Sequence, residues 1–136
     1  MKPPEGPALR RLVGQWLHKA ETDLQAAESL LSREPPLLYP SCFFSQQASE
    51  KYLKGFLTSN HVDFPKTHDL KALLDLAEPL NFNLARSLQD AIVLTPYGVE
   101  TRYPADMPEP TVAEAQEALR LAQSVRVAIL AALDLK

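Results

Sequence analysis

Long stretches without proline, each with apolar residues at helical spacing, constrain the fold of this chain most strongly. Proline breaks a helix interior and lacks an amide donor, so proline clusters mark connections between helices. The twelve prolines gather at residues 3–7, 35–40, 65, 79 and 96–110. Between them, apolar residues recur at i, i+3, i+4 and i+7, as on one face of an α-helix. The pattern predicts helices at about 8–32, 40–60, 68–78, 84–94 and 112–135.

Signals at the predicted helix ends agree with this division. Thr111 and Glu114 in "TVAE" form a capping box at the start of the last helix. Thr67 in "PKTHDL" is placed to cap the third helix, with His68 as its first residue. No segment shows the period-2 alternation of a half-buried strand. We therefore predict an all-α helical bundle that forms a single domain over residues 1–136.

Composition excludes several classes of function. The formal net charge of −3 argues against broad, non-specific binding of DNA or RNA, although a local basic patch stays compatible with it. The chain lacks the Glu-x-x-His, Cys/His and glycine-rich motifs of metal and nucleotide sites, so no metal or cofactor is predicted. The lone Cys42 lies in an apolar run and is expected to be buried, with a raised thiol pKa. No secretory signal or membrane-length apolar run is visible, which favours a cytoplasmic protein.

Polar residues are threaded through the predicted helix at 40–60, in "SQQASEKYLKGF". At 100° per residue they share one stripe, opposite a wide apolar arc. Three interpretations stay open: a solvated helix back, a binding site, or a buried network in which Glu50 pairs with Lys54 four residues later. The stripe consists of Gln47, Glu50, Lys51 and Lys54.

Two further segments contain candidate site residues. His68 lies beside Lys66 and Asp69 at a predicted helix N-terminus, where backbone amides favour anions; alternatively it merely occupies the first helical position. The connection at residues 95–110 is long for a compact domain, and long loops are often functional. It contains two tyrosines and an arginine, which are good anchors for a packed or binding loop, namely Tyr97, Arg102 and Tyr103.

Three motifs occur in a fixed order along the chain: "FFSQQASEKYLKGFL", "FPKTHDLKALL" and "ETRYPADMPEP". In this order they resemble the HEPN domain family, helical domains named for predicted nucleotide binding in higher eukaryotes and prokaryotes. The resemblance covers nearly the whole chain. It implies an up-and-down four-helix bundle with an additional short helix, to which the sequence adds the long connection at 95–110 as an ordered loop before the last helix. It also implies a homodimer or higher homo-oligomer built through the helices.

The resemblance implies a function as well. Family members often act as partners of a minimal nucleotidyltransferase, in pairs similar to toxin–antitoxin systems, and others are ribonucleases. The ribonuclease members carry an Arg-x(4–6)-His motif near the final helices. In this chain no histidine follows Arg86, Arg102, Arg120 or Arg126, and Arg11 and His18 have the spacing only on the first helix. No catalytic residue is therefore assigned.

The favoured hypothesis is a non-catalytic module that binds a nucleotide or a nucleotidyltransferase. Lysines would attract a phosphate, arginine would bind it in bidentate fashion and tyrosine would stack on a base. The alternatives are a ribonuclease in which His68 and Arg102 converge, and a structural bundle in which Arg102 pairs with Asp69 or Asp106. The candidate site residues are Gln47, Glu50, Lys51, Lys54, His68, Asp69, Arg102 and Tyr103.

Overall fold

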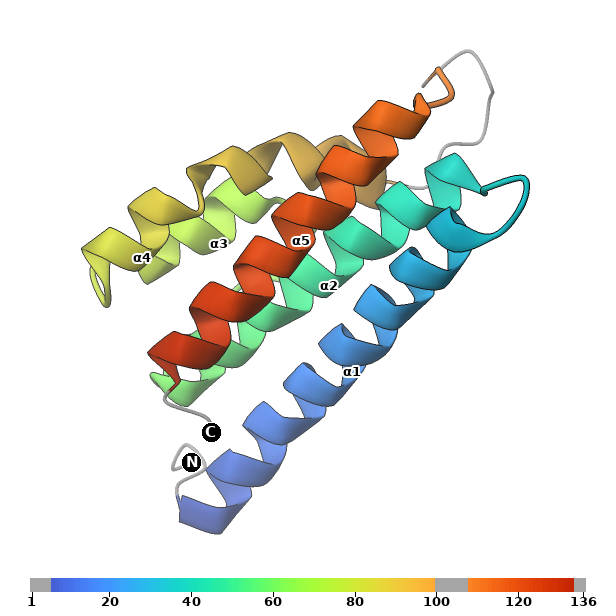
Figure 1. Ribbon diagram of the computed structural model, residues 1–136. Coiled ribbons are helices and arrows are strands. Elements are labelled where there is room, and N and C mark those ends of the chain that lie inside the picture. Colours follow the sequence, from blue (N-terminus) through green and yellow to red (C-terminus); the bar gives the residue numbers. More distant parts are fainter. Residues whose placement is uncertain (1–5, 100–107, 134–136) are drawn as a thin grey trace.

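The described part of the chain, residues 6–99 and 108–133 of a computed structural model, is helical and contains no strand (Figure 1). This confirms the predicted all-α bundle. Within these ranges no helix is long and apolar enough to cross a membrane. The elements are α1 (Gly6–Ser32), α2 (Leu38–Ser59), α3 (Leu70–Ala77), α4 (Phe82–Ser87), the 3₁₀-helix η1 (Gln89–Gly98) and α5 (Val112–Ala132).

Helix α2 lies at the centre of the bundle and packs against α1, α3, η1 and α5. In Figure 1, α1 lies on one side of α2, and the short helices lie on the other. The predicted apolar residues of α2 are buried except Phe44, which is partly buried, but polar residues on the remaining faces are buried too. An amphipathic helix with one solvated back is therefore the wrong description of α2. Its buried polar residues are Ser41, Ser45, Gln46, Ser49, Glu50 and Lys54.

The backbones of α1 and α2 approach closely because small residues lie between them. A β-carbon added to Gly55 would lie 3.3 Å from the Cβ of Trp16 and 3.4 Å from a methyl group of Leu17. Ser41 extends the contact by donating a hydrogen bond of 2.8 Å from Oγ to the carbonyl oxygen of Ala27. This packing brings the face of α1 that contains Trp16 beside the polar residues of α2.

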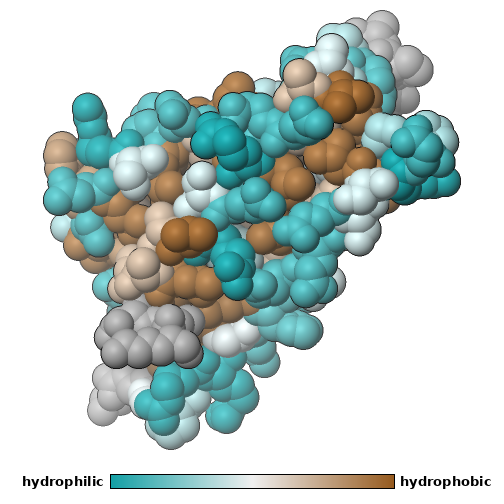
Figure 2. Space-filling model, in the orientation of Figure 1, coloured by the Kyte–Doolittle hydropathy of each residue, from teal (hydrophilic) through white to brown (hydrophobic). Residues whose placement is uncertain are grey.

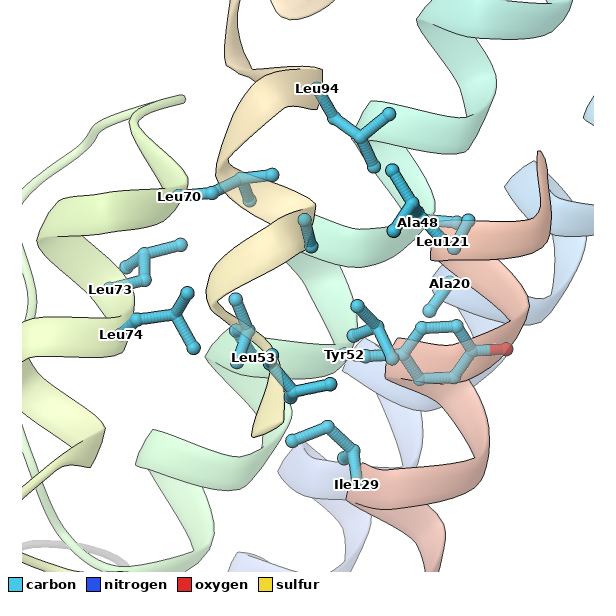
Figure 3. Packing of buried hydrophobic residues seen from close by; sticks show 14 of the residues in the cluster. Ala20, Ala48, Tyr52, Leu53, Leu70, Leu73, Leu74, Leu94, Leu121 and Ile129 are labelled. Carbon is cyan, nitrogen blue, oxygen red and sulfur yellow. The ribbon is translucent and has the colours of Figure 1, made fainter. Parts of the chain in front are cut away.

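The fourth side of the bundle is built from three short elements rather than one long helix. Figure 3 shows Leu70, Leu73 and Leu74 of α3 directed toward the core residues of α2, with Leu94 of η1 above them. The predicted helix at 84–94 is in fact two elements. Asn81 caps α4, which ends at Ser87, and the chain continues as the 3₁₀-helix η1.

Helix α5 begins with the predicted capping box. Thr111 Oγ1 accepts a hydrogen bond from the amide of Glu114, and the Glu114 side chain accepts one from the amide of Thr111. The connection before α5 differs from the prediction at its start, since residues 95–98 belong to η1. Most of the remainder, residues 100–107, lies outside the described part, and with it the predicted ordered loop.

Candidate functional site

The polar stripe of α2 is mostly covered in the folded protein. Glu50 is 3% exposed and Lys54 is 7% exposed. Gln46, four residues before Glu50, is fully buried and extends the same row. Residues spaced by four lie above one another on a helix face, so these three side chains meet. Burial rules out the solvated helix back for Glu50 and Lys54.

Glu50 is the centre of a hydrogen-bonded network. Its Oε2 atom lies 2.9 Å from Lys54 Nζ, which confirms the pairing expected from the i, i+4 spacing. Its Oε1 atom lies 2.7 Å from His68 Nδ1 and accepts a hydrogen bond of 3.3 Å from Gln46 Nε2. A buried carboxylate is costly unless it is paired and hydrogen-bonded, and these three partners satisfy it.

Lys54 has two aromatic neighbours in addition to Glu50. Its Nζ atom lies 5.7 Å from the ring centroid of Trp16 and 5.7 Å from that of Phe64. The two rings contact each other edge to face, with centroids 6.0 Å apart. Aromatic faces attract a cation at this distance, and the rings also cover the side chain from water. The ammonium group of Lys54 is therefore engaged by side chains of the protein itself.

His68 lies at the exposed end of this network, with a side chain that is 60% exposed. The backbone of His68 is also anchored to α2, because Gln46 Nε2 donates a hydrogen bond of 2.9 Å to the His68 carbonyl oxygen. Gly98 of η1 packs on the other side of Gln46, so closely that a β-carbon there would overlap the Gln46 amide. The buried part of the network thus fixes the position of one exposed imidazole.

The start of α3 differs from the prediction. Asp69, not Thr67, is the N-cap; its Oδ1 accepts a hydrogen bond of 3.0 Å from the amide of Lys71. Thr67 Oγ1 accepts one of 3.0 Å from the amide of Asp69. His68 therefore precedes α3, and a carboxylate already occupies the helix N-terminus. An anion at this helix start would therefore face the Asp69 carboxylate, and the anion site stays a prediction.

The remaining predicted residues separate from this network. Lys51 forms an ion pair with Asp23 of α1. Gln47 Nε2 donates a hydrogen bond of 2.7 Å to Gln46 Oε1, which links it to the network from the side. Arg102 and Tyr103 lie outside the described residues. The structure thus brings together Glu50, Lys54 and His68, with Gln47 beside them, and gives Lys51 a different partner.

Sequence reasoning missed a second polar cluster, which joins the three long helices. Glu21 Oε1 of α1 accepts hydrogen bonds of 2.5 Å from the hydroxyl of Tyr52 and 2.6 Å from Nε of Arg126. Burial alone would raise the pKa of Glu21, but the bonds from Tyr52 and Arg126, with the arginine's charge, outweigh it and lower the pKa. The only sequence signal was a tyrosine within an apolar helix face, which needs a partner for its hydroxyl.

The structure also shows the surroundings of the lone cysteine and of the residue types that bind metals. Cys42 is fully buried as predicted, and burial raises the pKa of its thiol to about 11. A thiol is a poor nucleophile when its pKa is far above neutral pH. Residues 6–99 and 108–133 contain no group of three or more His, Cys, Asp or Glu side chains that could hold a metal ion.

Comparison with known proteins agrees with the motifs and the fold. The profile of the HEPN domain matches residues 13–131. The crystal structure of TT1696 from Thermus thermophilus superposes with a TM-score of 0.68 at 31% sequence identity, covering 86% of this chain and 94% of that chain. The comparison with curated proteins gave no match. On the extent of the profile match, the chain belongs to the HEPN domain family.

Proposed function

We propose that this protein is a non-catalytic HEPN binding module, in which exposed His68 contacts a nucleotide or a nucleotide-handling partner protein. One observation carries this proposal. The buried carboxylate of Glu50 holds Nδ1 of His68 at 2.7 Å, while the side chain is 60% exposed. The bond at Nδ1 sets the ring orientation, so Nε2 is offered to solvent in a defined position.

The division of roles follows from burial. Replacing a buried ion pair with apolar residues is often neutral or stabilising, so stability alone does not require a charged pair at Glu50 and Lys54. The effect of the Glu50–Lys54 pair is to position His68. We therefore assign Glu50 and Lys54 to support, and His68 to ligand contact. Arg102 and Tyr103 stay sequence-based candidates for binding a phosphate and a base.

The partner we propose is a minimal nucleotidyltransferase, in a pair similar to a toxin–antitoxin system, with this chain as a homodimer or higher homo-oligomer. The HEPN motifs support this part of the proposal. A ribonuclease role has weaker support, because the chain lacks the Arg-x(4–6)-His motif near its final helices. Co-expression with a small nucleotidyltransferase encoded beside the gene, followed by co-purification, tests the pairing.

Two substitutions of His68 test its role. An asparagine amide can replace Nδ1 as a donor to Glu50 but has no counterpart of Nε2, so His68→Asn should keep the fold and lose binding. His68→Ala should lose binding as well. The measurement is a thermal-shift series with ATP, GTP and the corresponding monophosphates, and with the purified nucleotidyltransferase, because a ligand of the native state raises the melting temperature. We expect binding to weaken about tenfold or more, the loss of one charged or polar contact.

The matched control is His18→Ala, since His18 is also an exposed histidine but lies on a different helix, α1. It should bind as the wild type does. Full binding by His68→Asn would show that His68 is not the contact. If neither nucleotides nor the nucleotidyltransferase bind the wild type, the proposed function itself is wrong.

A further inference from the structure

An apolar groove runs between η1 and the first half of α5. Its cavity of about 270 Å³ is lined by Val93, Leu94, Tyr97, Ala113, Ala118 and Leu121, with Glu114 and Glu117. Val93 lies at the edge of this apolar hollow and is 63% exposed. Among residues 6–99 and 108–133, the groove therefore presents apolar surface that no described side chain covers.

The groove continues along α5. A smaller hollow of about 70 Å³ shares Leu121 with it and adds Leu88, Ala91, Asp90 and Arg120. From Ala113 to Ser124 the two hollows follow α5 for about 16 Å, at 1.5 Å per residue. About three turns of another helix would fit along this length.

The wall of the groove is an uncommon element. Helix η1 stays in the 3₁₀ conformation for 10 residues and includes Pro96, although 3₁₀ runs longer than three or four residues are rare. A 3₁₀-helix eclipses its side chains at i and i+3. Leu94 and Tyr97 are spaced in this way, and both line the groove.

The charge around the groove is predominantly negative. Three carboxylates line the two hollows, those of Asp90, Glu114 and Glu117, against the single guanidinium of Arg120. Arg120 is itself held by Glu117, through hydrogen bonds from Nε and Nη2. Negative charge from Glu114 and Glu109 also reaches the Cys42 thiol, where it adds to burial in raising the pKa. An occupant with acidic side chains would be repelled here.

We propose that this groove docks a basic amphipathic helix of a partner protein, with one or two apolar side chains in the cavity and lysines or arginines facing its acidic edge. Charge complementarity selects this occupant, because apolar anchors fill the floor and cations meet Asp90 and Glu114. The cavity is smaller than most small-molecule sites, which occupy roughly 300–1,000 Å³. Its size therefore suits side chains better than a nucleotide, and the inference does not depend on the role of His68.

The structure provides a matched control for the test. Val127 of α5 is 64% exposed, nearly the same as Val93. It lies in a hollow of about 280 Å³ between α1 and α5, which also contains carboxylates, those of Glu21 and Glu28. Both hollows are therefore acidic and similar in size, but only the groove along η1 has a largely apolar lining.

The probe is a fluorescein-labelled peptide of about 14 residues, made of leucine and lysine with leucines at i, i+3, i+4 and i+7. A second peptide has glutamate in place of lysine. Fluorescence anisotropy with the full chain should show binding of the lysine peptide and none of the glutamate peptide. Val93→Lys should weaken binding at least about tenfold, and Val127→Lys should leave it unchanged, because only the first places a charge at the groove.

Three results would overturn the proposal. The first is no binding of the lysine peptide, and the second is equal binding of both peptides. The third is an equal loss in Val93→Lys and Val127→Lys, which would mean that charge over the whole surface attracts the peptide. Light scattering tests whether a second copy of this chain occupies the groove instead. If Val93→Lys dissociates a homo-oligomer that Val127→Lys leaves intact, a second copy covers the groove, and the proposal of a partner helix is wrong.

Discussion

Three serines on one stripe of α2 show how single hydroxyl groups affect the stability of this bundle. Ser41, Ser45 and Ser49 are all fully buried. The hydroxyl of Ser41 bonds the carbonyl oxygen of Ala27, and that of Ser49 donates a hydrogen bond of 2.9 Å to the carbonyl oxygen of Ser45. The Ser45 hydroxyl has no hydrogen-bond partner among the described residues. A buried polar group without a partner loses its hydration without compensation.

We therefore predict opposite effects for two chemically identical substitutions. Ser45→Ala should raise the free energy of unfolding, by up to about 1 kcal/mol, because it removes an unsatisfied buried hydroxyl. Ser41→Ala should lower it by about 1 kcal/mol, because it removes a hydrogen bond between buried groups of α2 and α1. Urea denaturation measures both. Equal losses in the two variants would mean that the Ser45 hydroxyl does have a partner in solution.

At the scale of elements, the C-terminal end of α2 determines how the chain turns back toward the Glu50–Lys54–His68 network. His61 has a φ of 59°, in the left-handed region that glycine adopts without strain. The amide of Val62 donates to the Leu57 carbonyl oxygen, and the amide of His61 donates to that of Thr58. These two bonds form a Schellman motif, with histidine where glycine is usual. The turn directs Phe64 back to Lys54 and His68 to Glu50.

The backbone strain at His61 can be measured by comparing two substitutions. His61→Ala removes the imidazole but keeps a β-carbon in the left-handed conformation, whereas His61→Gly removes both. The left-handed conformation costs roughly 1–2 kcal/mol for a residue with a β-carbon, and glycine loses about 0.5–1 kcal/mol of extra chain entropy. His61→Gly should thus be more stable than His61→Ala by about 1 kcal/mol in thermal or urea unfolding. The reverse order would exclude strain at this turn.

At the scale of the whole molecule, the Glu21 cluster connects the three long helices. In Figure 3 the ring of Tyr52 lies in the core and its hydroxyl oxygen points outward beside α5. There it meets Glu21 of α1, which also accepts from Arg126 of α5. Elsewhere α1 and α5 contact each other little. The face of the molecule in Figure 2 carries both hydrophilic and hydrophobic patches. The cluster is thus a major link between α1 and α5.

This cluster predicts a specific dependence of stability on pH. The pKa of Glu21 in the folded protein is lowered from its ordinary 4.5, so the unfolded chain takes up a proton first as the pH falls. The stability that Glu21 contributes is complete above pH 4.5 and is lost progressively below it. Glu21→Gln should therefore flatten the acid limb of a stability–pH curve. Tyr52→Phe, which keeps the pair with Arg126, should flatten it less; an unchanged acid limb in Glu21→Gln would exclude the cluster.

Local patterns in the sequence determined the elements and part of the site. Apolar spacing and proline placement gave the three long helices, because both act within a few residues of the chain. The capping box of α5 and the Glu50–Lys54 pair were predictable for the same reason. The division of residues 84–94 into α4 and η1 was missed, because 3₁₀ and α-helical conformations have similar local signals.

Only the tertiary structure decided what the polar residues of α2 do. Glu50 meets His68 across 18 positions, and Lys51 meets Asp23 across 28, so no local spacing could have paired them. The burial of Lys54 depends on Trp16 and Phe64, which come from α1 and from the segment after α2. Sequence periodicity shows which side chains share a helix face, but packing against other segments decides whether water, a charge or an aromatic ring covers that face.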